Sequence, residues 1–356
     1  MRLLRSIIIL SLLAIGGYFL LDSNNVTPRE AVNDFSEKLK EKTSLLKSKE
    51  VPEREVEPTI SLNGEIFQWI GKSKDELTNK LGEPLRKDLS AYGYEWWVYT
   101  DQTNQYIQFG ILDQKITTIY ATGKDLSIEP FHVGQAYQEV QKKFAFSNKI
   151  TVQRGLSSYT FKLTEEEKKM RPLVKIDDDV FLQFYFDTFT SELSAVRVLS
   201  GDVLLKQRPY AIEYRGELPE SNNLSDKEWN KIESGMEQQI FSISNVIRNQ
   251  HGKSKLEWID SVSEVAFKHS KDMAVNNYFS HYGLNGDGLK ERLATQDVFY
   301  LAAGENIAAQ YTDAPAAMQG WLNSEGHRKA LLENSYTHIG VGVYHFYYTQ
   351  NFIKKP

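Results

Sequence analysis

The chain has 356 residues, of which 41% are hydrophobic and 25% are charged, and its formal net charge is −5. At roughly 150 residues per domain, this length predicts two folded domains. The chain contains no cysteine, which excludes disulfides, thiolate metal sites, cysteine nucleophiles and a lipoprotein anchor. The negative charge gives no reason to expect a nucleic-acid partner, and we predict none.

The first 21 residues combine Arg2 and Arg5 with an apolar run at 6–21. This arrangement is typical of a secretory signal or a signal anchor. Because no convincing small-residue cleavage motif follows the run, residues 1–21 are predicted to be an uncleaved anchor. The alternative is a signal peptide whose cleavage releases a secreted protein. Arginines stay on the cytoplasmic side, so we expect a cell-membrane protein that crosses the bilayer once, with its bulk outside the cytoplasm.

Residues 22–59 are polar and densely charged. Thr27, Pro28 and Glu30 are typical of a helix start, with a capping threonine and a proline at the first helical position. A thin stripe of apolar residues follows and predicts a short amphipathic helix, after which the chain contains prolines. We interpret this segment as a linker or stalk that lifts the domains off the membrane.

Residues 60–218 contain an internal repeat. Segments that begin at Trp69 and His132 share glycine, glutamate, lysine and apolar positions at a fixed offset of 63 residues. Each predicts a helix that follows a glycine, and strand-like runs come after each helix. These runs lie at 106–113, 115–123, 181–187 and 192–200, with a charged insertion at 165–179. Two such units are expected to pack as an α+β domain, in which we find no catalytic constellation.

This block resembles the CAP-associated N-terminal domain that precedes CAP domains in some bacterial proteins. The motifs that carry the resemblance are IGKSKDELTNKLGEP, YGYEWWVY, HVGQAYQEV, RPL and RPYAIEYRGEL. The resemblance implies an architecture but no function. Trp96 and Trp97 are adjacent and would point to opposite faces of a strand. One is expected in the core, and the other at a domain interface or in a second buried face.

Residues 226–356 predict a second domain. Ser225 and Glu228 form a capping box, and apolar residues at helical spacing continue from there to a closing glycine, Gly252. Further helices are expected at about 260–276 and 312–323. The segment HIGVGVYHFYYTQNFI predicts two strands around a turn near residues 344–346. Helices that flank a small sheet indicate an αβα sandwich, so the whole chain is predicted to be α+β.

Six of the seven histidines fall in the last 106 residues. His281 and His327 each lie just past a predicted helix end, and Glu305 lies between them in a predicted loop where Gly304 frees the backbone. Side chains on such loops can converge in a cleft. Two neutral imidazoles and a carboxylate suit a divalent metal such as zinc, with water in an open position. The same groups could act as general acid and base without metal, or form a buried polar network with no chemistry.

The second domain also carries a set of motifs in a fixed order: HSKDMAVNNYFSH, AAGENIA, GWLNSEGHRKALL, IGVGV and YYTQNF. In this order and spacing they resemble the bacterial CAP superfamily, the SCP-like proteins related to cysteine-rich secretory proteins, antigen 5 and plant pathogenesis-related 1 proteins. The resemblance covers about 229–353. It implies an αβα sandwich with a cleft of two histidines and two acidic residues, where some members hold zinc.

Matched by motif, His281, Glu305 and His327 correspond to the first histidine, the glutamate and the second histidine of that cleft. Glu325 is a candidate for the second acidic residue, although it stands where bacterial relatives often have proline. Asn306 and Gln350 are expected to orient the site through hydrogen bonds, or else to cap a loop and fill a strand.

Three other histidines have structural interpretations. His269 lies on an apolar helix face and is expected to be a hydrogen-bonded core residue. His338 begins a strand and His345 lies in a turn, so both are expected to be structural or exposed.

These patterns favour a surface binding or scaffolding module whose cleft binds zinc and whose partner is an unknown surface protein, a cell-wall component or a lipid. CAP proteins lack a single shared reaction, which supports this expectation. One alternative is a metal-dependent hydrolase acting on peptides or cell-wall material, with His281, Glu305, Glu325 and His327 as catalytic candidates. A second is lipid or sterol binding. The sequence leaves open whether the cleft catalyses a reaction.

Overall fold

A computed structural model describes residues 60–356 of the chain. The predicted anchor at 1–21 and the predicted stalk at 22–59 lie outside these residues. Within 60–356, none of the helices combines the length and the apolar character needed to cross a bilayer. The described residues 60–356 belong to one compact unit, and its elements confirm the predicted α+β class.

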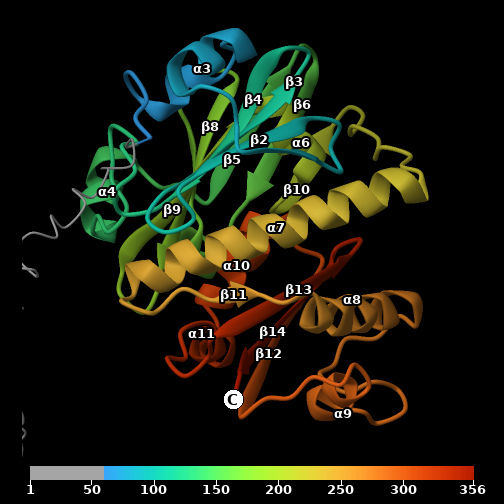
Figure 1. Cartoon of the computed structure of the whole chain (residues 1–356). Coiled ribbons are helices and arrows are strands. Elements are labelled where there is room, and N and C mark those ends of the chain that lie inside the picture. The colour runs from blue at the N-terminus through green and yellow to red at the C-terminus, as the bar shows by residue number, and fades with distance from the viewer. Residues whose placement is uncertain (1–59) are drawn as a thin grey trace, which may run out of the picture. The chain divides into compact units, whose positions relative to one another are not determined.

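The first domain is built on a seven-stranded antiparallel sheet (Figure 1). In spatial order its strands are β1 (Arg86–Leu89), β2 (Glu95–Thr100), β3 (Tyr106–Leu112), β4 (Lys115–Thr122), β9 (Glu192–Ser200), β8 (Val180–Asp187) and β7 (Leu173–Lys175). The four strands that the repeat predicted are β3, β4, β8 and β9. They form two hairpins that join through the β4–β9 pair.

The two repeats start with the same hydrogen bond. Gly71 donates its N–H to the Ile116 carbonyl of β4 at 2.8 Å, and Gly134 donates to the Leu193 carbonyl of β9 at 2.7 Å. Both glycines have a positive φ that disfavours other residues. The helices that follow are α3 (Lys74–Leu81), which Ser73 caps, and α4 (Tyr137–Lys143). With the 3-10 turn Ile66–Trp69, they cover one face of the sheet.

One end of the opposite face is covered by elements that the sequence did not reveal. These are a second sheet of order β10–β6–β5 (Ala211–Arg215, Ser157–Lys162 and Lys149–Arg154) and the helices α5 (Glu165–Met170) and α6 (Gly201–Gln207). Trp96 belongs to the core between the two sheets, whereas Trp97 packs into the core beside α3. Trp96 therefore lies in a second buried face of the first domain.

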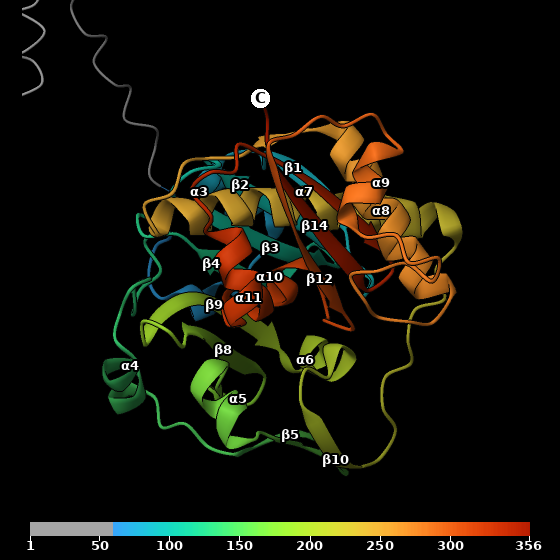
Figure 2. The same cartoon turned by 90° about the horizontal axis from the view of Figure 1, so that it is seen from below.

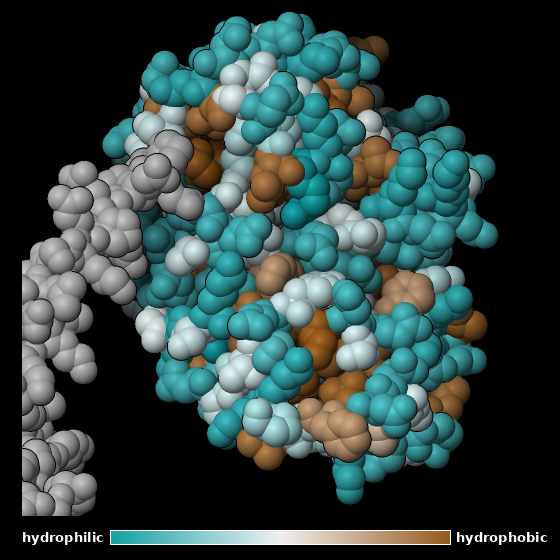
Figure 3. All heavy atoms as spheres, viewed as in Figure 1, coloured by the Kyte–Doolittle hydropathy of each residue, from teal (hydrophilic) through white to brown (hydrophobic). Residues whose placement is uncertain are grey.

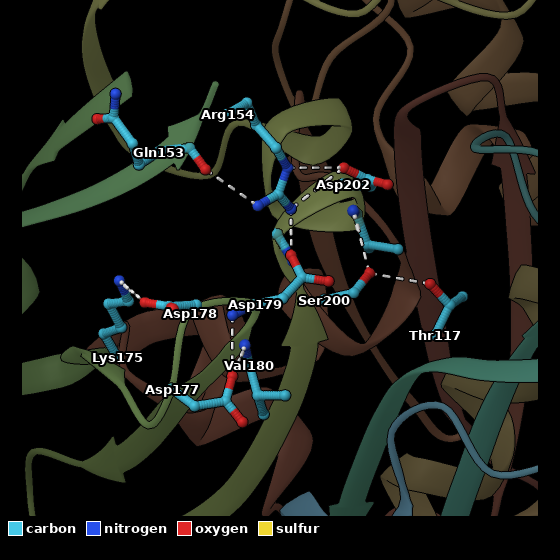
Figure 4. Close-up of polar contacts among 12 residues, drawn as sticks. Thr117, Gln153, Arg154, Lys175, Asp177, Asp178, Asp179, Val180, Ser200 and Asp202 are labelled. Atoms are coloured by element: carbon cyan, nitrogen blue, oxygen red, sulfur yellow. Dashed lines mark hydrogen bonds and ion pairs between the residues drawn. The ribbon is translucent and has the colours of Figure 1, made fainter. Parts of the chain in front are cut away.

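A polar cluster ties the second sheet to the first (Figure 4). Arg154, at the end of β5, pairs with Asp179 in the turn before β8 and with Asp202 in the first turn of α6. Asp179 also accepts the N–H of Gly201, where α6 begins. These ion pairs are exposed and contribute little stability, so we interpret them as fixing the position of α6.

The second domain is the predicted αβα sandwich. Its sheet has the order β11 (Glu257–Trp258), β13 (His338–Tyr344), β14 (Tyr347–Lys354) and β12 (Ala302–Ala309). The helix α8 (Asp260–Val275) packs on one face, and α7 (Asp226–Gln250) and α10 (Ala314–Leu322) pack on the other. Two shorter helices are α9 (Leu289–Ala294) and α11 (Glu325–Leu331). The capping box at Ser225, the end of α7 before Gly252 and the turn at residues 344–346 are confirmed.

Two local predictions around the site are wrong. Glu305 lies on β12, an edge strand paired with β14, and not in a loop. His327 follows the end of α10, as predicted, but it lies inside the next helix, α11, and not in a loop. Gly326 is helical and makes no turn there, because the chain turns at Asn323 and Ser324, between α10 and α11. Gly304 is needed for space, since a Cβ at that position would collide with the hydroxyl of Tyr336.

The helices α7 and α10 form a layer shared by the two domains. Figure 1 shows α7 lying across the molecule between the two sheets, and Figure 2 shows the same arrangement from below. Tyr120 and Tyr185 of the large sheet share one hydrophobic core with Ile240 of α7 and Trp321 of α10. The layer therefore buries apolar surface from both domains, which explains why residues 60–356 belong to one unit.

Candidate functional site

The structure brings His281, Glu305 and His327 together from three elements. His281 follows α8, Glu305 lies on β12 and His327 lies in the first turn of α11. The centres of the two imidazole rings are 6.4 Å apart. His281 Nδ1 is 2.9 Å from Glu305 Oε1. The His281 side chain is 49% exposed while that of Glu305 is 5% exposed, so a buried carboxylate supports an accessible imidazole.

Glu305 has a second partner, Arg292 of α9, which sequence reasoning missed. Arg292 Nη2 lies 2.6 Å from Glu305 Oε2, and Arg292 Nη1 donates to the backbone carbonyl of His281 at 3.0 Å. Arg292 thus holds both the carboxylate and the loop that carries His281. Burial alone would raise the pKa of Glu305, but the hydrogen bond with His281 and the charge of Arg292 outweigh it and hold that pKa below its usual value.

A chain of buried amides holds His327. His327 Nδ1 is 2.9 Å from Ser324 Oγ, and its backbone carbonyl accepts a hydrogen bond from Asn306 Nδ2 at 3.0 Å. Asn306 also donates to Gln350 Oε1 at 3.2 Å, and Gln350 donates to Ser244 of α7 at 2.8 Å. Asn306 and Gln350 therefore connect the backbone of His327 to the central helix. Burial, followed by the neighbouring His281, lowers the pKa of His327.

The other candidate residues within 60–356 make no hydrogen bond or ion pair with the side chains of His281 and His327. Glu325 is exposed at the start of α11, and its side chain makes no hydrogen bond or ion pair with any other residue in 60–356. His269 is buried, and its Nε2 is 3.0 Å from the Ser280 carbonyl, so it positions the loop before His281. His338 lies near Glu257 at the sheet edge, and the His345 ring stacks on Trp229.

The two imidazoles lie close to the separation that a shared metal ion requires. Zinc–nitrogen bonds are about 2.0–2.1 Å and zinc sites are tetrahedral, which places two ring centres roughly 5 Å apart. The observed separation is 6.4 Å, so the rings would move about 1 Å closer to bind one zinc ion. In the described part of the chain, no group of three or more histidine, aspartate or glutamate side chains is arranged to hold a metal. Two imidazoles would thus be the protein ligands, with other positions open.

Comparison with known proteins identifies the family of both domains. Residues 70–210 match the family described as CAP-associated N-terminal, and residues 241–353 match the cysteine-rich secretory protein family. An uncharacterized membrane protein of Bacillus subtilis (strain 168), YlbC, is 44% identical over 354 residues, or 99% of each chain. The chain belongs to the cysteine-rich secretory protein (CAP) family. The CAP domain is thus the part that contains His281, Glu305 and His327.

Two solved structures resemble this CAP-family chain. One is an extracellular protein containing an SCP domain from Bacillus anthracis, 44% identical, with a TM-score of 0.78 over 84% of this chain and 99% of the other. The second is a cysteine-rich secretory protein from Staphylococcus aureus, 24% identical, with a TM-score of 0.73 over 83% of this chain and 97% of the other. The second likeness shows the fold alone. Each match covers nearly all of the other protein's chain, so both solved structures extend over the two domains.

Proposed function

We propose that this CAP-family protein is a membrane-anchored, extracytoplasmic binding module in which His281 and His327 hold a divalent metal such as zinc. The observation that carries the proposal is the arrangement of the imidazoles. Each Nδ1 is engaged by a protein oxygen, of Glu305 or of Ser324. Neither Nε2 has a hydrogen-bond partner within residues 60–356. This pattern, with one nitrogen anchored and the other open, is typical of metal-binding histidines.

The protonation of His281 follows from its neighbour. An ionised carboxylate can only accept hydrogen bonds, so the proton of neutral His281 is on Nδ1 and the lone pair is on Nε2. We assign Glu305 a positioning role behind His281, because His281 and Arg292 engage its two oxygens. A bound zinc ion would supply a Lewis acid with open positions for water or for a group of the partner.

Exposed apolar side chains near the histidines support a binding surface. Six of the ten large hydrophobic residues that are exposed within 60–356 fall in the segment 275–301, which also contains His281 and Arg292: Val275, Phe279, Tyr282, Leu284, Phe299 and Leu301. Figure 3 shows hydrophobic groups among hydrophilic ones on the part of the surface over α8 and α9. Apolar groups gathered on one segment are typical of contact surfaces, so we infer that the partner contacts this segment.

The location outside the cytoplasm rests on the N-terminal sequence and on relatives. A protein 44% identical over 99% of the chain is named as a membrane protein, and a solved relative is named as extracellular. Arg2 and Arg5 before an apolar run favour an anchor with its bulk outside. Protease treatment of intact cells should degrade the CAP domain while a cytoplasmic marker survives. Protection of the CAP domain would contradict this location.

The metal proposal is tested by titrating zinc into residues 58–356 by calorimetry. We expect one zinc per chain, and a loss of binding in His281→Ala/His327→Ala. Glu305→Gln should weaken affinity by about 10–100-fold, as expected when a group behind a ligand is changed. His338→Ala, a histidine outside the site, is the matched control and should bind like wild type. Equal binding by the double variant and wild type would refute the proposal. Zinc-dependent peptide hydrolysis lost in the double variant would replace the binding module with a hydrolase.

A further inference from the structure

A pocket lies between the two domains and shares no residue with the histidine site. Its volume is about 760 Å³, within the roughly 300–1,000 Å³ typical of small-molecule sites. The first domain contributes the end of α5, the end of α6 and the loop at Tyr92. The CAP domain contributes α10, the segment after β12 and the turn between β13 and β14. Figure 2 shows α5, α6 and α10 from below.

The walls of this interdomain pocket are aromatic and held in place. Tyr92 donates to the Thr312 carbonyl at 2.9 Å, and its ring centre is 6.5 Å from that of Phe346. Tyr311 lies against α10 at Gly320, where any Cβ would collide with the tyrosine ring. Fixed aromatic surfaces of this kind bind flat apolar groups without a large ordering cost.

The pocket is positively charged. Its lining contains Arg171 and Arg208, and no aspartate or glutamate among the described residues. Arg171 is partly neutralised by Glu167 at 2.6 Å, although its Nε is buried without a hydrogen-bond partner. Arg208 ends α6 in a left-handed conformation, and its guanidinium makes no ion pair or hydrogen bond within 60–356. In a chain of net charge −5, this is a local site for a negative group.

A buried amide adds a further unfilled position. Gln319 of α10 lines the pocket and is 2% exposed. Its Nε2 donates to the hydroxyl of Tyr120 at 2.9 Å, while its Oε1 is buried and has no hydrogen-bond partner. Buried polar atoms are nearly always paired, so this oxygen retains the capacity to accept a hydrogen bond from a bound group.

From these observations we propose that the interdomain pocket binds a small organic anion. Arg208 and Arg171 would hold a carboxylate or phosphate head, the rings of Tyr92, Tyr311 and Phe346 would contact a flat apolar body, and Gln319 would accept a hydrogen bond. Because both domains form the pocket, such a ligand binds only when the domains are docked. It would thus link the first domain, whose sequence offered no function, to the CAP domain.

Ligand-observed NMR on the full-length chain in detergent tests this proposal. The probes are phenyl phosphate and benzoate, which separate the two head groups, together with neutral benzamide and inorganic phosphate. We expect one or both aromatic anions to bind at least about tenfold more tightly than benzamide and than inorganic phosphate, as loss of a charged hydrogen bond or of the apolar contact predicts.

Variants then locate the site. Arg208→Gln should weaken binding of the aromatic anion at least about tenfold, and Arg208→Lys should restore part of it. Arg215→Gln, an exposed arginine on β10 outside the pocket lining, is the matched control and should bind like wild type. Ala316→Leu, which adds volume to the lining without removing charge, should also reduce binding. The proposal is overturned if no probe binds, if benzamide binds as tightly as benzoate, or if Arg208→Gln binds like wild type.

Discussion

The substitution Asp313→Ala should destabilise the docked pair of domains more than other single changes at their interface. Asp313 caps α10 by accepting the N–H of Ala316 at 3.0 Å, and its Oδ1 is 2.7 Å from Arg197 Nη2 on β9 of the first domain. The side chains of Arg197 and Asp313 are only 1% and 6% exposed. Removing the carboxylate leaves a buried guanidinium with Gln207 as its hydrogen-bonding partner.

The expected loss can be set from these contacts. Breaking a buried ion pair by removing one partner costs about 3–5 kcal/mol, and losing a helix cap costs about 1 kcal/mol. Asp313 Oδ2 and Arg197 Nε are unpaired, so the pair makes a single hydrogen bond. We therefore take the lower end of the range for a broken buried ion pair. The variant should lose about 3–4 kcal/mol of unfolding free energy, a large part of the roughly 5–15 kcal/mol typical of a folded unit.

Urea denaturation of residues 58–356, followed by tryptophan fluorescence and circular dichroism, measures this loss. Asp313→Asn keeps a capping oxygen and should lose less. The double variant Arg197→Met/Asp313→Ala should recover part of the loss, because no charge remains buried without a partner. A loss below about 1 kcal/mol, or a double variant that loses the sum of the two single losses, would refute the reasoning.

Three further predictions follow from other contacts. Burial raises the pKa of Glu237 from 4.5 to about 7, so its ionisation destabilises the fold as pH rises between these values. The free energy of unfolding of Glu237→Gln, measured relative to wild type, should therefore rise by up to about 3 kcal/mol when the pH is raised from about 4.5 to about 8. The same difference between variant and wild type at both pH values would contradict this. Gly342→Ala should lose at least about 1–3 kcal/mol in chemical denaturation, because the new Cβ would overlap the backbone of Phe267 in α8. Asn323→Ala should lose about 1–2 kcal/mol, because Asn323 Oδ1 accepts from the N–H and the hydroxyl of Thr188 in the first domain; an unchanged denaturation midpoint would count against it.

The elements with strong periodic patterns were predictable from the sequence. The hairpins β3–β4 and β8–β9 have long apolar runs, and α7 has a capping box at Ser225. The strand β12 was not predictable, because in AAGENIAA only Ile307 is a bulky residue that favours strands. It forms through its pairing with β14, in which Glu305 lies opposite Asn351. Such pairing is a tertiary effect that outweighs local propensity.

Only those site residues that lie in recognisable sequence motifs were predictable. The resemblance to CAP proteins singled out His281, Glu305 and His327, and the structure places them together. No sequence pattern marked Arg292 as a site residue, since a lone arginine in a six-residue helix is usually a surface residue. The pair Arg197–Asp313 was hidden for a related reason, because the two residues are 116 positions apart and each resembles an ordinary charged residue. Contacts of this kind come from how the domains dock.

The measurement that tests the central claim most directly is a crystal structure of residues 58–356 grown with zinc, with data collected at the zinc absorption edge. The account predicts one strong anomalous peak between the two imidazoles, about 2.0–2.1 Å from Nε2 of both His281 and His327, with the Glu305 carboxylate still on His281 and Arg292. An anomalous peak coordinated by the Glu305 carboxylate, or no peak between the two histidines at saturating zinc, would contradict it.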